Sequence, residues 1–134
     1  MFKFSGQRPT NLGVNQGRLA PCPGTPNCVC SDDQDAEHAI APLTYTTNQA
    51  AAMAALKQVI QSMERAQIIT ESADYLYAEF TTKLMGFVDD VEFYFAPAAK
   101  VIQVRSASRL GKSDLGVNRA RIETIRTKLQ ATGV

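Results

Sequence analysis

Residues 88–109 read VDDVEFYFAPAAKVIQVRSASR, and this stretch decides the fold. Apolar and polar side chains alternate along it: Val91 and Phe93 fall on one face of an extended chain, and Asp90 and Glu92 fall on the other. The alternation returns after a break in the middle of the stretch. A period of two on both sides of a turn predicts an antiparallel pair of strands with one buried and one polar face.

The segments on either side of this pair supply the remaining elements. We expect a short strand at 43–46, a helix at 46–65, strands at 66–70, 75–84, 88–95 and 100–109, and a helix at 118–130. Thr46 or Thr47 would cap the first helix, and Gln49 would complete a capping box. The order β-α-β-β-β-β-α predicts an α+β fold: an antiparallel sheet of four to five strands with two helices on one face.

The chain divides near residue 41. Residues 1–41 hold most of the prolines and all three cysteines and show no regular period, so we expect an irregular N-terminal arm draped over a single α+β domain at residues 42–134. A formal net charge of +1 gives no field to attract nucleic acid. The sequence has no apolar run long enough to cross a bilayer and no secretory signal, which predicts a cytoplasmic protein without a transmembrane segment. If the natural protein has a targeting segment that this sequence lacks, we would instead expect a membrane-peripheral, lumenal or periplasmic location.

The turns between strands set which polar residues meet on the exposed face. A turn at 96–99 would place Asp90 opposite Arg105, and a turn at 85–88 would place Lys83 opposite Asp90. The expected polar cluster consists of Lys83, Asp89, Asp90 and Glu92. Two interpretations stay open for it: a solvated sheet face laced with ion pairs, or a shallow polar binding site.

An arginine-rich stretch, RSASRLGKSDLGVNRAR at 105–121, joins the last strand to the last helix. The first turn of a helix offers unpaired backbone N–H groups, and guanidinium forks bind carboxylate or phosphate. We therefore predict an anion-accepting turn built from Arg105, Ser106, Ser108, Arg109, Ser113, Asp114, Asn118 and Arg119. Alternatively, the arginines form ion pairs within the protein, because Asp89, Asp90 or Asp114 can bind the same guanidinium groups. The stretch contains no phosphate-loop motif.

The cysteines and the single histidine lie close together in the arm. Cys22, Cys28 and Cys30 do not have the spacing of a structural zinc site, and His38 is the one imidazole that could join them. Inert reduced thiols, a Cys22–Cys28 disulfide, and metal-binding or catalytic use all stay open. His38 lies in the acidic segment DDQDAEHAI, which favours a solvated surface residue. No metal or cofactor is predicted.

Four separated blocks of sequence resemble one known family. The blocks are CPGTPNCVCS, IAPL, GFVDDVEF and VRSASRLGKSDLGVNRARI, and together they resemble the family catalogued as domain of unknown function 1499. Cys22 and Cys28 match the pattern of that family, whereas Cys30 stands where serine is common. The family occurs in bacteria, cyanobacteria and plastids, and the NLGV opening resembles the cyanobacterial form. The resemblance implies no particular reaction or ligand.

Two functions from different classes are compatible with these features. The first is a non-catalytic binding or assembly module, whose arginines hold an anionic small molecule, a lipid head group or a protein partner. The second is a small hydrolase-like or isomerase-like enzyme that uses Asp90 and Glu92 as acid and base, with arginines stabilising negative charge. Asp89 and Asp90 point to opposite faces of a strand, which counts against a shared catalytic site. The oligomeric state stays open.

Overall fold

The computed structural model describes residues 6–83, 86–111 and 114–134. Its elements are β1 (Val14–Asn15), β2 (Arg18–Leu19), β3 (Cys28–Cys30), β4 (Leu43–Thr44), α1 (Gln49–Gln61), β5 (Ala66–Glu71), β6 (Tyr75–Thr81), β7 (Val88–Phe95), β8 (Val101–Ser108) and α2 (Val117–Ala131). From β4 onward this is the predicted order, and the α+β fold is confirmed. No helix in the described part of the chain is long and apolar enough to cross a bilayer.

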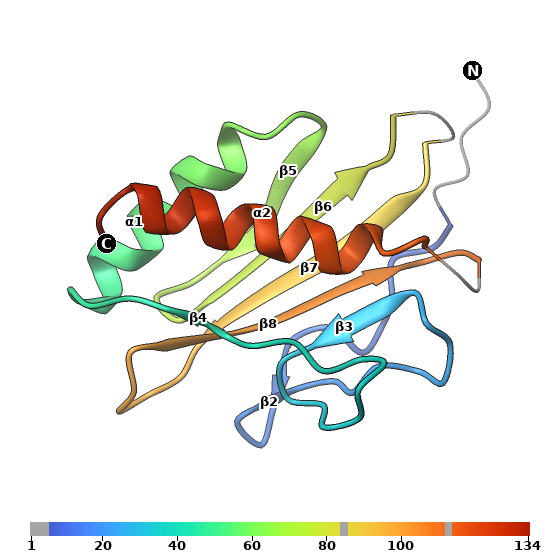
Figure 1. Ribbon diagram of the computed structural model, residues 1–134, viewed down its shortest axis with the longest axis horizontal. Coiled ribbons are helices and arrows are strands. Elements are labelled where there is room, and N and C mark those ends of the chain that lie inside the picture. The colour runs from blue at the N-terminus through green and yellow to red at the C-terminus, as the bar shows by residue number, and fades with distance from the viewer. Residues whose placement is uncertain (1–5, 84–85, 112–113) are drawn as a thin grey trace.

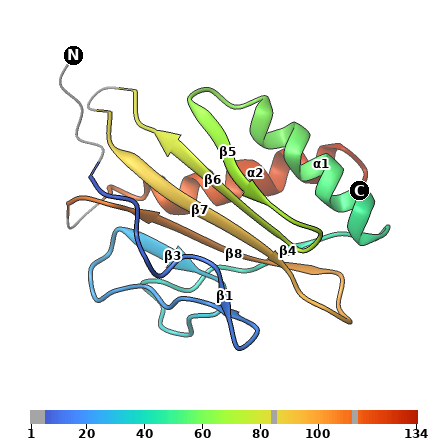
Figure 2. The same cartoon turned by 180° about the vertical axis from the view of Figure 1, so that it is seen from behind.

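The strands form one open antiparallel sheet with the helices on one side. The strand order is β3-β8-β7-β6-β5, and β4 also pairs with β8. Both helices lie across the same face of this sheet (Figure 1). Figure 2, seen from behind, shows the N-terminal arm on the opposite side of the sheet. The helices therefore cover one face of the sheet, and the arm covers the part of the other face near β8 and β3.

The hydrophobic core lies between the sheet and the two helices. Phe93 and Val104 are fully buried on the sheet side, and Leu56, Ile122 and Ile125 meet them from the helices. Full burial of such a side chain contributes about 1.5–3 kcal/mol to folding. The predicted alternation of apolar residues is thus confirmed: one face of every long strand packs into this core.

The predicted strand register is wrong by an even number of residues. Arg105 lies opposite Glu92 rather than Asp90, and Asp90 lies opposite Glu79 rather than Lys83. The connections are longer than expected, because β6 ends before Lys83 and the chain turns between Ala96 N–H and Val101 C=O. An even shift leaves every side chain on its predicted face, so the apolar pattern alone does not reveal it.

The cap of α1 also differs from the prediction. Asn48, not Thr46 or Thr47, is the N-cap residue, and its side-chain oxygen accepts a hydrogen bond from Ala51 N–H at 2.9 Å. Thr46 is used elsewhere, since its backbone N–H donates to the carbonyl of Val134 at 2.8 Å. Asn48 is among the best N-cap residues because its short side chain reaches the free N–H groups of the first turn.

The start of α2 is held by a carboxylate rather than left open. Gly116 is the N-cap residue, with φ of 82°, a conformation that favours glycine. Asp114 Oδ1 accepts from Gly116 N–H at 2.8 Å, and its Oδ2 accepts from Asn118 N–H at 3.1 Å. The N-terminal N–H groups that the sequence offered to an external anion are therefore satisfied in part by Asp114.

The arm is more ordered than the sequence indicates. It contains three short strands, and β3 pairs with β8 so that Cys28 lies opposite Ala107 and Cys30 opposite Arg105. Val29, between them, is part of the hydrophobic core. Three residues are too few to show a period of two, which explains why this strand was not predicted. The arm is thus joined to the sheet as its edge.

We expect Asn48→Ala to lower the free energy of unfolding by about 1 kcal/mol, because the first turn of α1 loses its side-chain acceptor. Chemical denaturation measures this change. Thr47→Ala is the matched control and should change stability much less. A larger loss in the Thr47 variant would show that the helix is capped as the sequence first suggested.

Candidate functional site

The sheet face that carries the charged residues is buried beneath the arm. We call it the polar face, and it consists of Tyr75, Tyr77, Glu79, Asp90, Glu92, Arg105 and Arg109. Asp90, Glu92 and Arg105 are exposed by only 1%, 0% and 4%. The expectation of an open, solvated face is therefore wrong, because the arm crosses this side of the sheet (Figure 2). Its charges are removed from water and need partners within the protein.

Arg109 is saturated by acceptors. Its Nε lies 2.9 Å from Asp90 Oδ2, and one terminal nitrogen lies 2.9 Å from Asp90 Oδ1 and 2.6 Å from Glu79 Oε2. Tyr77 donates its hydroxyl to Asp90 at 2.5 Å and lies 2.8 Å from Glu79 Oε2. Arg8, from the arm, adds a 2.7 Å contact to the same carboxylate of Glu79. Burial raises the pKa of Glu79, but its bonds to Arg8, Tyr77 and Arg109 outweigh this and lower the pKa.

Glu92 is the most deeply buried carboxylate of the polar face. Its Oε1 accepts from Gly13 N–H of the arm and from the Tyr75 hydroxyl, both at 2.7 Å. Burial raises the pKa of Glu92 above its usual value, although the Gly13 and Tyr75 bonds and the charge of Arg105 act in the opposite direction. Burial also raises the pKa of Tyr75, and its bond to Glu92 adds to that shift.

Arg105 is held far more loosely than Arg109. One terminal nitrogen lies 3.8 Å from Glu92 Oε2, and the other lies 3.5 Å from the carbonyl of Pro21. Among the residues that the structure describes, Arg105 Nε and Glu92 Oε2 are the buried side-chain atoms without a hydrogen-bond partner. A buried guanidinium with unused donors is costly, and an anion is the partner it fits best.

Arg105 lines a pocket between the arm and the sheet. The pocket measures about 450 Å³. Its walls are Gln7, Pro9, Asn11, Pro21, Cys22 and Pro23 from the arm, and Asp90, Arg105, Ala107, Ser108 and Arg109 from the sheet. This volume lies within the usual range for small-molecule sites, about 300–1,000 Å³. The loosely held arginine is therefore part of the wall of a pocket of ligand size.

Ser106 and Ser108 of the predicted anion-accepting turn bond to Asn118 of α2, on the helix-covered side of the sheet. Ser106 donates to Asn118 Oδ1 at 2.6 Å, and Asn118 Nδ2 donates to Ser108 at 2.8 Å and to Asp114 at 2.7 Å. Asp89 is on this face too, where Arg121 lies 2.7 Å from its carboxylate. Burial raises the pKa of Asp89, and the charge of Arg121 opposes the shift.

The predicted site residues therefore separate into two groups rather than one. Arg105 and Arg109 are on the polar face, whereas the serines, Asp114 and Asn118 hold α2 against the sheet. Arg119 donates to the carbonyl of Glu37 at 3.3 Å, away from both groups, and Lys83 is exposed beyond the end of β6. Ser113 lies outside the described residues. Sequence patterns do not identify the arm residues that complete the polar face, because these residues have no regular period and lie far away in the chain.

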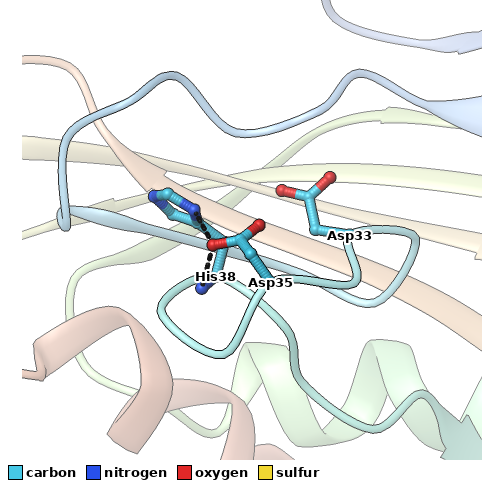
Figure 3. Close-up of side chains that lie close together, drawn as sticks. All are labelled: Asp33, Asp35 and His38. Carbon is cyan, nitrogen blue, oxygen red and sulfur yellow. Dashed lines mark hydrogen bonds and ion pairs between the residues drawn. The ribbon is translucent and has the colours of Figure 1, made fainter.

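His38 forms a second polar cluster in the arm, with Asp33 and Asp35 (Figure 3). His38 is 6% exposed, so the expectation of a surface histidine is wrong. Its Nδ1 lies 2.6 Å from Asp35 Oδ2, and its Nε2 lies 2.8 Å from the carbonyl of Thr25. Both neighbours are acceptors, which favours a proton on each ring nitrogen. A metal ion needs a free nitrogen lone pair, so this cluster is better suited to an ion pair that pins the arm.

The cysteines of the arm are divided between a disulfide and a free thiol. Cys22 and Cys28 form a disulfide, and Cys30 is free and fully buried. Burial raises the pKa of Cys30 to about 11. A thiol with such a pKa is mostly protonated near neutral pH and is a poor nucleophile.

The comparison with protein-family models gives one match. The model described as "Protein of unknown function (DUF1499)" matches residues 18–129, which is most of the chain. The matched segment begins within the arm and includes the whole six-stranded sheet, α1, and all of α2 except its last two residues. No curated protein matches the chain.

We expect Arg109→Met to lower the free energy of unfolding by about 3–5 kcal/mol, because it leaves the buried carboxylate of Asp90 without its cation and leaves Glu79 with Arg8 alone. Urea denaturation measures the loss. Arg65→Met is the control, since Arg65 is exposed and pairs with the neighbouring Glu64. The double variant Arg109→Met/Asp90→Asn should recover part of the loss. Equal stability of Arg109→Met and the parent protein would contradict this account of the polar face.

His38 should make stability depend on pH. The bond to the Thr25 carbonyl, and then Asp35, raise the pKa of His38 against the effect of burial. A raised folded-state pKa stabilises the protein below the unfolded-state value, and the stabilisation is lost as pH rises through the folded-state pKa. The free energy of unfolding should therefore fall as the pH rises above the ordinary histidine pKa of about 6.5. His38→Gln should flatten this part of the profile; an unchanged slope would mean that other groups cause it.

Proposed function

This chain belongs to the DUF1499 family, and from that premise we propose that it is a non-catalytic binding protein for a small anion of the carboxylate or phosphate class. The ligand site is the pocket between the arm and the polar face, and Arg105 is the residue that holds the anion. The enzyme alternative has less support, since Asp90 and Glu92, its candidate acid and base, are both buried and already bonded.

The observation that carries the proposal is the contrast between two buried arginines. Arg109 has close contacts to Asp90 and Glu79, whereas Arg105 has only contacts of 3.5 Å or more to Pro21 and Glu92 and an unpartnered Nε. Both side chains line the same pocket. A carboxylate or phosphate entering it would give Arg105 the short, charge-assisted hydrogen bonds that it lacks.

The charge balance of the polar face supports an anion as the ligand. The three cations Arg8, Arg105 and Arg109 face the three carboxylates Glu79, Asp90 and Glu92. Glu92 is the carboxylate opposite Arg105, and burial raises its pKa, so it takes up a proton at a higher pH than an ordinary glutamate does. Once Glu92 takes up a proton, the three cations exceed the remaining two carboxylates at the place where Arg105 lines the pocket.

The remaining predictions about partners and location stay predictions. A lipid head group or an acidic protein segment could present the same carboxylate or phosphate, but the recessed position of Arg105 beneath the arm favours a free small molecule. The disulfide Cys22–Cys28 favours an oxidising compartment over the cytoplasm expected from the sequence. The resemblance of the NLGV opening to the cyanobacterial form of the family stays a prediction. The expectation that the protein does not bind nucleic acid stays a prediction as well.

Titration with inorganic phosphate and with succinate, at constant ionic strength, tests the proposal. We expect saturable shifts of the Arg105 Nε–H signal in NMR spectra, and an affinity about tenfold or more weaker in Arg105→Gln, which loses a charged hydrogen bond. Arg65→Gln serves as the control and should bind as the parent does. Affinity should rise as pH falls through the raised pKa of Glu92, because protonation frees Arg105. Glu92→Gln should remove that pH dependence.

Two results would overturn the proposal. One is the absence of saturable shifts at Arg105 with either anion. The other is binding that is lost in Arg119→Gln and kept in Arg105→Gln, which would place the anion at the start of α2 instead of in the pocket.

A further inference from the structure

The pocket that contains Arg105 has a disulfide in its wall. Cys22 is half-buried and lines the pocket, and it is bonded to Cys28, which is 1% exposed and belongs to β3. Pro21 and Pro23, on either side of Cys22, line the pocket as well. A molecule in the pocket therefore lies beside Cys22, Arg105 and Arg109 at the same time.

We propose that the Cys22–Cys28 disulfide is a redox centre served by this pocket, and that its reductant is an anionic low-molecular-weight thiol. This inference rests on the proposed function, because Arg105 would bind the carboxylate or sulfonate of the thiol. The thiolate attacks Cys22 Sγ and forms a mixed disulfide, while the Cys22–Cys28 bond breaks and Cys28 leaves as a thiolate that takes up a proton. A second thiol attacks the mixed disulfide and leaves Cys22 reduced, so two thiols become one small disulfide and the protein gains two thiols.

Accessibility decides which sulfur is attacked. Cys28 is buried in the edge strand β3, where it pairs with Ala107. A molecule in the pocket therefore approaches the disulfide from Cys22, which lines the pocket. Cys30 lies two residues further along the same strand, but it is fully buried and burial raises its pKa to about 11. An internal exchange by Cys30 is therefore slow, and the reductant has to come from outside.

The arginines give this step its selectivity. A positive pocket concentrates an anionic thiol near the disulfide and also stabilises the negative charge on the attacking sulfur. A neutral thiol of similar size gains less from the same pocket, and a cationic thiol is repelled. Because Cys22 and its neighbours form the arm wall of the pocket, reduction would also free that wall from β3 and change how firmly an anion is held.

The test is the rate of disulfide reduction in the folded protein, followed by alkylation of the released thiols and mass spectrometry. The probes are 2-mercaptoethanesulfonate, which is anionic, 2-mercaptoethanol, which is neutral, and cysteamine, which is cationic, with rates expressed per thiolate. We expect the anionic probe to react about tenfold faster than the neutral one, as electrostatic steering allows. In Arg105→Gln this ratio should fall to about one, whereas Arg65→Gln should keep it.

A measurement on the unaltered protein guards against a variant that fails to fold. Inorganic phosphate should slow reduction by the anionic probe more than it slows reduction by 2-mercaptoethanol, because it competes for Arg105 as well as occupying the pocket. Equal rates per thiolate for all three probes, with no effect of phosphate, would overturn the redox proposal. If phosphate still shifts the Arg105 signal in that case, anion binding stands and only the redox proposal fails; if phosphate does not bind at all, the proposed function fails as well.

Discussion

Charge pairing beneath the N-terminal arm is the constraint on which the structure depends. Three carboxylates and two arginines of the sheet are removed from water on one face, and the arm supplies a further cation from Arg8 and a backbone donor from Gly13. Each charge would be strongly destabilising without its partner. The arm is therefore part of the folded domain in energetic terms, and it completes the sheet just as the helices complete the other face.

The same constraint separates structural residues from candidate ligand-binding residues. Arg109 has its acceptors within 2.9 Å, and so does Arg121 on the helix side, so both are accounted for by stability alone. Arg105 is also buried, but its Nε has no hydrogen-bond partner, and the residue lines a pocket. A protein that buries a charge without full compensation usually has a use for it, which is why function is assigned to this arginine and not to the whole basic stretch.

The sequence predicts the architecture well and the site only in part. Alternation in strands such as β7 and the apolar stripe of α2 identify the elements and assign Asp90 and Glu92 to the face opposite the core. The covering of that face could not be predicted, because the arm has no periodicity and its contacts, such as Gly13 with Glu92, join residues far apart in the chain. The prediction of one anion-accepting turn does not separate Ser106 from Arg105, although neighbouring residues of a strand point to opposite faces.

The neighbouring residues Asp89 and Asp90 have a consequence for how the sheet aligns. Each carboxylate pairs with a different arginine: Asp89 with Arg121 on the helix-covered face, and Asp90 with Arg109 on the polar face. A shift of β7 along β8 by two residues would keep the apolar side chains in the core. It would also separate Asp89 from Arg121 and Asp90 from Arg109 at the same time. Hydrophobicity thus decides which face of the strand is buried, whereas the ion pairs of Asp89 and Asp90 fix its position along its own axis.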